Sequence, residues 1–315
     1  MSNQLKTLDG FLEYHKTKQD QSPTHTKIGD HTIGVYGASY CIPHEDMESF
    51  YKLYHKDVFQ NNKLAYITEV QLSEKGPILI DIDERLPLHI NKRQHDDEQI
   101  LDVINLYIEK LLEIVKTRDF EIPIYVLEKD EVNIIPDKHV KDGVHIILSV
   151  SIPHAAKEIL RKNVINDLSN IFPEDYPLTN TFEELLDAGV CNGKINWQLF
   201  GSRKPGNQGY KLKKIYKAII KDGELNEYEE TLIKNKINYL NILPKISARN
   251  LDIDDLELID SVKEEIENLK KAALVRKKPR VNVVNATFND ILECQNLFPE
   301  IKSKGQCEKI MNYIL

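Results

Sequence analysis

The sequence predicts a mixed α+β fold in which apolar strands alternate with a few amphipathic helices. Runs of branched apolar residues predict strands near 64–71, 77–83, 122–128 and 143–150. Between residues 96 and 118, apolar residues recur at helical spacing, which predicts a helix that packs one face on a sheet. A chain of 315 residues is long enough for one large domain or two modest ones, with a sizeable core.

The N-terminal sixty residues predict two helices and two short strands. A first helix is expected at 5–18, and glycine-punctuated strands are expected at Thr32–Tyr36 and Ser39–Ile42. A second helix should begin at Pro43 and run to about Val58. Proline suits the first turn of a helix, and two acidic residues follow it there.

The second half of the chain continues the alternation and then becomes charged. Pro153 precedes an expected helix at 154–170, and strands are expected at 195–201 and 211–220. From about residue 224 the pattern is mostly helical. We therefore divide the chain into a main catalytic domain at 1–222, a helical accessory region at 223–280 and a small helical segment at 281–315.

Composition and charge exclude several classes of protein. A net charge of −8 argues against a whole-protein polyanion binder, although it allows a local basic cleft. The four cysteines have neither CxxC nor Cys/His ligand spacing, which argues against zinc and against a disulfide framework, and indicates a reducing, intracellular compartment. No apolar run is long enough for a secretory signal or a membrane span.

The most informative motif is the apolar strand that ends in Asp81-Ile82-Asp83. Side chains alternate across a strand, so the two carboxylates emerge on the same face, with Cα atoms roughly 6.6 Å apart. Carboxylates this close repel each other unless a cation lies between them, and a divalent metal ion serves this role well. The ordinary alternative is a strand that runs into a solvated acidic turn.

Two further positions are candidates for chemistry. His145 follows Gly143 at the start of an apolar strand, where the alternative is a hydrogen-bonded core histidine. Asp187 precedes Gly189, where the alternative is a solvated acid at a helix end.

A glycine-rich basic loop follows the expected strand at 195–201. Its glycines and its adjacent cations suit close approach of N–H groups and positive charge to phosphate, and the alternative is an ordinary basic hairpin loop. Lysines extend the positive charge beyond the loop. The loop residues of interest are Ser202, Arg203 and Lys204, and the lysines are Lys211, Lys213 and Lys214.

In this order, the DxD strand, the Gly-x-His strand, the lone aspartate and the Gly-Ser-Arg-Lys loop resemble the archaeo-eukaryotic primase superfamily. Within it, the sequence is most similar to the primase domain of the poxvirus-type primase–helicases of large nucleocytoplasmic DNA viruses. The resemblance covers roughly residues 25–220. It implies a core related to an RNA-recognition-like sheet, flanked by an αβ unit, with a mostly helical C-terminal region.

The resemblance also implies roles for individual residues. The catalytic acids that hold two Mg²⁺ or Mn²⁺ ions fall on Asp81, Asp83 and Asp187, although Glu183 and Glu184 lie near the third position. The nucleotide-binding residues fall on His145, Gly143, Ser202, Arg203 and Lys204. The family often has serine where this chain has Gly143, so a hydroxyl contact is absent there, and a backbone N–H remains.

The expected function is that of a DNA-directed primase or primase-polymerase, which makes primers on a single-stranded DNA template from NTP or dNTP substrates for viral replication. Lys211, Lys213 and Lys214 are expected to bind the template backbone. A P-loop is absent from the sequence, so we expect no ATPase motor within these residues. The resemblance implies a superfamily 3-type helicase as a partner in cis or in trans, and a site of action in the host cytoplasm. Two alternatives stay open: another DxD transferase of nucleotide diphosphates, and a non-catalytic nucleic-acid-binding module of a replicative helicase.

Overall fold

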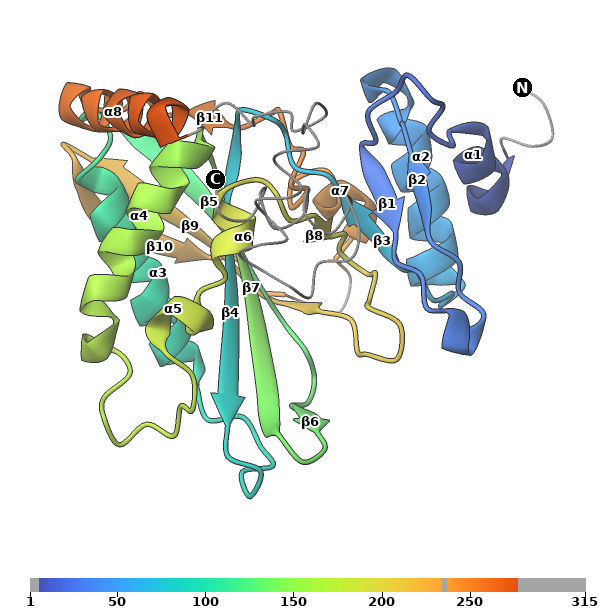
Figure 1. Ribbon diagram of the computed structural model, residues 1–315, viewed down its shortest axis with the longest axis horizontal. Coiled ribbons are helices and arrows are strands. Elements are labelled where there is room, and N and C mark those ends of the chain that lie inside the picture. The colour runs from blue at the N-terminus through green and yellow to red at the C-terminus, as the bar shows by residue number, and fades with distance from the viewer. Residues whose placement is uncertain (1–5, 234–236, 277–315) are drawn as a thin grey trace, which may run out of the picture. The chain divides into compact units, whose positions relative to one another are not determined.

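The computed structural model describes residues 6–233 and 237–276. The chain divides into two compact units, Met1–Val262 and Lys263–Leu315. Helices and antiparallel sheets both occur in the first unit, which confirms the α+β prediction (Figure 1). The expected helical segment at 281–315 lies outside the described residues. No described helix is both long enough and apolar enough to cross a membrane.

A large, mostly antiparallel sheet forms one half of the first unit. The long strand β7 pairs with the edge strand β4 on one side and with β5 on the other. β6 and the parallel strand β11 pair with the two ends of β7. The strands are β4 (Lys75–Leu86), β5 (Phe120–Glu128), β6 (Asn133–Ile135), β7 (His139–Pro153), β9 (Lys211–Lys221), β10 (Glu224–Glu230) and β11 (Asp254–Asp255).

A smaller antiparallel sheet belongs to the N-terminal part of the chain, with β8 joining from far along the sequence. Its strand order is β2-β1-β3-β8. Figure 1 shows α1 and α2 beside these strands. The elements are α1 (Leu8–Tyr14), β1 (His25–Lys27), β2 (Ala38–Tyr40), α2 (Met47–Tyr54), a π-helical turn (His55–Gln60), β3 (Ile67–Glu69) and β8 (Trp197–Gln198).

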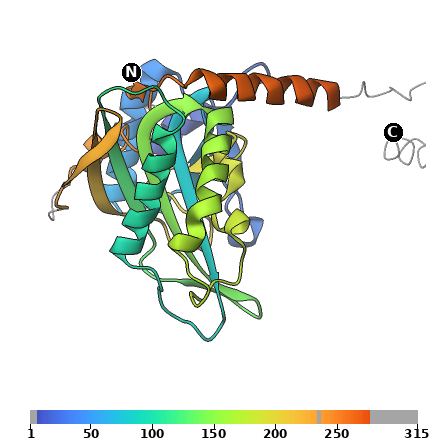
Figure 2. The same cartoon turned by 90° about the vertical axis from the view of Figure 1, so that its left-hand side faces the viewer.

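Two long helices, α3 (Asp97–Leu112) and α4 (His154–Asp167), cover one face of the large sheet (Figures 1 and 2). The side chain of Asp96 caps α3 by accepting a hydrogen bond from the Gln99 N–H. The apolar stripe read from the sequence is the buried face of α3. The sheet therefore has one helix-covered face and one face left for the smaller sheet.

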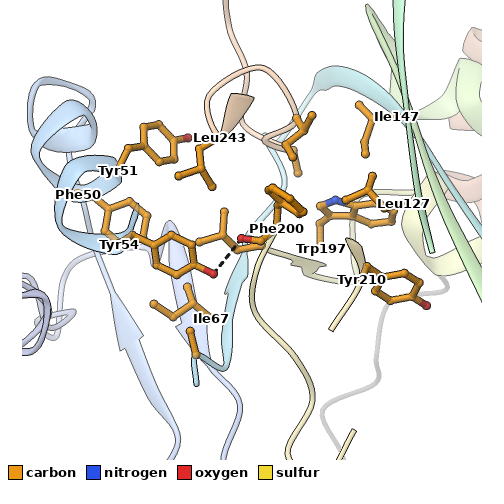
Figure 3. Packing of buried hydrophobic residues seen from close by; sticks show 14 of the residues in the cluster. Phe50, Tyr51, Tyr54, Ile67, Leu127, Ile147, Trp197, Phe200, Tyr210 and Leu243 are labelled. Atoms are coloured by element: carbon orange, nitrogen blue, oxygen red, sulfur yellow. Dashed lines mark hydrogen bonds between the residues drawn. The ribbon is translucent and has the colours of Figure 1, made fainter. Parts of the chain in front are cut away.

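The opposite face of the large sheet packs against the N-terminal part through a shared apolar core (Figure 3). Leu127 and Ile147 of the large sheet belong to the same cluster as Phe50 and Tyr54 of α2. Tyr54 is fully buried, and its hydroxyl donates to the Phe200 carbonyl at 2.9 Å. Burying each large apolar side chain contributes about 1.5–3 kcal/mol, so this core holds the two sheets together.

Three sequence-based assignments were wrong in detail. The expected strand at Thr32–Tyr36 is a 3-10 turn at His31–Ile33, capped by the Asp30 side chain. The strand at 195–201 shrinks to the two residues of β8. Residues 224–230 form the strand β10 where a helix was expected, because Asp222 and Gly223 both have positive φ and turn β9 back on itself.

Short helices and turns complete the described chain. The accessory region that we expected to be helical from residue 223 begins instead with β10, a strand of the large sheet. The remaining helical elements are His44–Asp46, Leu168–Asn170, α5 (Phe182–Leu185), α6 (Ala188–Cys191), α7 (Tyr239–Ile242) and α8 (Asp260–Arg276).

Candidate functional site

The DxD acids and the histidine motif lie directly opposite each other on paired strands. In the β4–β7 ladder, Asp81 is opposite His145 and Asp83 is opposite Gly143. Leu79, on the same face of β4, belongs to the core between the sheets. Both acids therefore point toward the smaller sheet and away from the helices.

Asp187 joins the two DxD acids through backbone pairing along the free edge of β4. Its N–H donates to the Asp81 carbonyl at 3.0 Å, and the preceding Leu186 bridges to Ile82. The Asp187 carboxylate caps α6 by accepting from the Gly189 N–H at 2.7 Å. The structure therefore brings the third predicted acid to the first two.

The two neighbouring glutamates are engaged elsewhere. Glu183 Oε2 lies 2.8 Å from Arg161, and Glu184 Oε1 lies 3.0 Å from Arg85. Glu184 also completes a capping box with Thr181 at the start of α5. Of these acids, Asp187 alone lines the cavity described next.

A cavity of 410 Å³ lies between the two sheets, and Asp81, Asp83 and Asp187 are in its wall. A pocket of this size is typical of small-molecule and cofactor sites. Four cations line the same wall: Lys129, Lys141, Lys194 and Lys204. Acids and lysines thus share one pocket, which suits a ligand that carries both metal ions and phosphates.

The surroundings of Asp81 disfavour its negatively charged form. Burial raises its pKa from 3.8 to about 7, and the nearby charges of Asp83 and Asp187 add to the rise, while Lys141 opposes it. The buried Oδ1 of Asp81 makes no hydrogen bond, and the His145 Nε2 lies 3.5 Å from it. A carboxylate oxygen left in this state fits a metal cation.

His145 is buried between two aromatic rings. Its ring stacks on Tyr210 with centroids 3.6 Å apart, and Trp197 lies on it at 4.2 Å. Burial lowers the pKa of His145 well below its usual value, and Lys129 and Lys204 lower it further. The imidazole is therefore neutral near pH 7, so it offers a hydrogen-bonding nitrogen instead of a positive charge.

Gly143 is required by a close approach. A Cβ at this position would lie 2.6 Å from the Tyr210 hydroxyl, so the serine common in the family has no room here. The Gly143 N–H donates to the Asp142 Oδ1 at 3.0 Å and is not free to bind phosphate. The Tyr210 hydroxyl occupies the space beside Gly143 instead.

The basic loop begins with a bend at Gly201. Gly201 has a φ of +88°, and a Cβ there would lie 2.6 Å from the Phe59 ring. Ser202 is fully buried, and its Oγ accepts from the Ile67 N–H at 3.0 Å and contacts the Tyr54 hydroxyl at 2.8 Å. Ser202 therefore anchors the loop and does not face the cavity.

Arg203 and Lys204 point into different pockets. Lys204 lines the main cavity, whereas Arg203 lines a second pocket of 270 Å³ together with Lys63 and Lys211. The buried Nε of Arg203 has no hydrogen-bond partner. The second pocket also has an aromatic wall formed by Phe59, Phe200 and Tyr239.

The predicted lysines of β9 do not form one group. Lys211 pairs with Asp130 at 2.5 Å and lines the second pocket. Lys214 pairs with Asp97 of α3 at 3.0 Å, so it lies on the helix-covered side of the sheet. Lys213 is exposed and lines neither pocket.

Sequence reasoning missed several cavity residues. Lys141 alternates with Gly143 and His145 on one strand face, and this period of two was the available signal. Lys129 lies 4.9 Å from the Tyr210 ring centroid, and nothing in the sequence marks that contact. Trp197 and Tyr210 were also missed, because only the packed structure brings them to His145.

Comparison with known families settles the classification. A model of the family described as "C962R protein N-terminal AEP domain", where AEP denotes archaeo-eukaryotic primase, matches residues 30–216. The chain belongs to this archaeo-eukaryotic primase family. The matched region runs from before β2 into β9 and contains the three acids, the four lysines and His145 of the main cavity.

A curated relative carries a helicase name. The "Putative helicase L207/L206" of Acanthamoeba polyphaga mimivirus is 27% identical over 212 residues. The match covers 65% of this primase-family chain and 21% of the relative. The match therefore spans about a fifth of the length of that longer viral protein.

Proposed function

We propose that this chain is a template-directed nucleotidyltransferase that makes or extends primers on single-stranded DNA during viral DNA replication. The observation that carries the proposal is the convergence of Asp81, Asp83 and Asp187 with four lysines in one cavity. Membership of the primase family supports the same reaction. The relative's helicase name supports a helicase partner, in cis or in trans.

The acids fit Mg²⁺ or Mn²⁺. Asp81, Asp83 and Asp187 offer hard oxygen ligands, and the buried Asp81 Oδ1 has no other partner. When bound, these ions would neutralise the phosphates and favour deprotonation of a primer 3′-hydroxyl. The three carboxylates repel one another, and cations bound between them would relieve this repulsion. The concentrated negative charge would therefore attract the ions.

The lysines and the histidine have complementary tasks. Lys129 and Lys204 present positive charge to the β- and γ-phosphates of a nucleoside triphosphate. Lys141 Nζ lies 2.8 Å from Asp83 Oδ2, which balances that carboxylate. The neutral His145, held by its aromatic neighbours, donates one N–H in a fixed direction.

The second pocket is our candidate for the template. Its aromatic wall offers faces on which bases stack, and Arg203 and Lys211 offer charge to the backbone. Template affinity should therefore depend on Arg203, while nucleotide affinity depends on Lys204.

Nucleotide incorporation tests the proposed function directly. The wild-type chain should extend a primed single-stranded template with labelled dNTP or NTP in the presence of Mg²⁺ or Mn²⁺. Asp187→Asn should lower the rate by about 10²-fold or more, because it removes a metal ligand. Rates on primed and unprimed templates give the measurement.

Glu183→Gln and Glu184→Gln are the matched controls, because these glutamates pair with Arg161 and Arg85 and neither lines the cavity. Both variants should keep near wild-type rates. An active Asp187→Asn chain would move the third ligand elsewhere. Wild-type DNA binding without incorporation would favour a non-catalytic helicase module, and sugar transfer from a nucleotide diphosphate would favour another DxD transferase.

Because Arg203 and Lys204 line different pockets, substituting them one at a time distinguishes the functions of the two pockets. Lys204→Ala should raise the nucleotide KM and leave the salt dependence of DNA binding unchanged. Arg203→Ala should reduce the slope of log K against log salt by about 0.7, the contribution of one single-strand phosphate, and spare the KM.

Lys214→Ala controls for general loss of charge, because Lys214 lies on the helix-covered side. It should change neither the KM nor the salt slope. If Arg203→Ala raises the KM while Lys204→Ala flattens the slope, the nucleotide and template pockets are exchanged.

A further inference from the structure

A second group of ligand-type side chains lies on the helix-covered face of the sheet, behind the DxD acids. Glu84 follows Asp83 on β4, Asp142 precedes Gly143 on β7, and His95 comes from the loop before α3. We call these three residues the rear cluster. Their ligand atoms all lie within 4.8 Å of one another, which makes this a closer group than the three cavity acids.

The rear cluster is sealed from solvent and incompletely paired. Glu84 and Asp142 are 0% exposed, and His95 is 5% exposed. The Glu84 Oε2 and the His95 Nε2 are buried without a hydrogen-bond partner. Unpaired polar atoms at this depth are costly, so the cluster lacks its full set of hydrogen-bond partners.

The carboxylates in and beside the rear cluster carry more negative charge than the neighbouring arginine neutralises. Glu84, Glu128 and Asp142 are three carboxylates, and Arg93 is the cation that pairs with two of them. Burial lowers the pKa of His95, but hydrogen bonds with Glu128 and Glu84 outweigh this effect and raise the pKa to about 9, so the metal-free histidine carries a proton. A metal ion bound to His95 displaces that proton, and with a neutral His95 two negative charges remain in a buried site. One divalent ion would neutralise them, whereas a proton on His95 would neutralise half.

The distances suit a metal with one imidazole and two carboxylate ligands. His95 Nδ1 lies 2.9 Å from Glu84 Oε1 and 4.0 Å from Asp142 Oδ2. Ligand atoms about 2.0–2.2 Å from one metal ion lie about 3–3.5 Å apart, so small side-chain movements would close the site. We propose that the rear cluster binds one divalent transition-metal ion, of which Zn²⁺ is the best fit.

The surroundings match those of known histidine ligands. The other ring nitrogen of His95, Nε2, faces the Glu128 Oε1 at 3.8 Å, and a metal-bound histidine typically gives this second N–H to a carboxylate. Arg93 donates to both Asp142 oxygens at 2.8 and 3.0 Å and so orients that carboxylate. An imidazole ligand suits Zn²⁺ better than Mg²⁺, which prefers oxygen ligands and water.

Equilibrium dialysis with Zn²⁺ tests the site without reference to catalysis. The Asp81→Asn/Asp83→Asn double variant of the full chain serves as background, because it removes metal binding in the main cavity. We expect it to hold about one Zn²⁺ per chain, and X-ray absorption should show one nitrogen among oxygen ligands. Zn²⁺ should raise its melting temperature, and equal Mg²⁺ should not.

Adding His95→Gln or Glu84→Gln should weaken Zn²⁺ binding at least about 100-fold and abolish the thermal response. His89→Gln, an exposed histidine in the same loop, should leave both unchanged. Should both cluster variants fail to fold, Zn²⁺-dependent shifts of the His95 imidazole NMR signals in the background variant provide the reading. An absence of Zn²⁺ binding, or binding that survives both substitutions, would make the cluster an ion-pair network around a protonated His95.

Discussion

Asp81→Asn or Asp83→Asn should abolish nucleotide incorporation, with a loss on the order of 10³-fold or more. Each substitution removes an anionic ligand from the cavity wall that Asp187 and four lysines share. A loss of this size corresponds to several kcal/mol of transition-state stabilisation. Incorporation rates at saturating Mn²⁺ give the measurement, and an active variant would contradict the metal assignment.

The same Asp81→Asn variant should be more stable than the wild type at alkaline pH. Burial raises the pKa of Asp81 from 3.8 to about 7, so the folded state binds this proton more tightly than the unfolded state. The raised pKa of Asp81 therefore contributes its whole stabilising free energy below about pH 4, and this contribution is lost as the pH rises toward 7. The difference in melting temperature should be largest at pH 8 and vanish near pH 4.

Arg93→Ala should destabilise the fold more than any substitution of a surface cation. Arg93 bonds both Asp142 oxygens and also Glu128, whose side chains are 0% and 8% exposed. Removing the arginine leaves two buried carboxylates without their partner, which costs about 3–5 kcal/mol. Urea unfolding of the full chain measures the change.

Arg85→Ala provides the matched control. Arg85 pairs with Glu184 at 3.0 Å, and both side chains are more than a third exposed. Exposed pairs contribute about 0–1 kcal/mol, so the unfolding free energy should hardly change. Equal effects of the two substitutions would mean that the buried network does not hold the strands together.

Much of the fold followed from local periodicity. The continuous apolar runs of β4, β5 and β7, which are buried on both faces over much of their length, and the 3.6-residue stripe of α3 are strong signals. The strand β10 was missed because its sequence is acidic and mostly exposed. Its pairing with the lysines of β9 decides its conformation, and the Asp222-Gly223 turn was the overlooked signal.

The candidate site was predicted in part. Motif order identified Asp81, Asp83, His145, Asp187 and Lys204, and the structure brings all five into one cavity. The direction of a loop side chain is set by packing, so the sequence could not separate Arg203 from Lys204 or show that Ser202 is buried. The rear cluster escaped notice because its members lie on three separate segments, and only folding brings Asp142 beside Glu84 and His95.

The long-range pairing of the smaller sheet has a consequence for synthesis of the protein. Thr68 of β3 pairs with Gln198 of β8, and the cavity wall is completed only by Tyr210. During translation, the strands β1 to β3 must therefore wait for more than a hundred further residues before their partner strand emerges. Contacts this distant in sequence form slowly, and unpaired strand edges aggregate. Slow elongation or a bound chaperone in the expressing cell should accordingly raise the yield of folded chain.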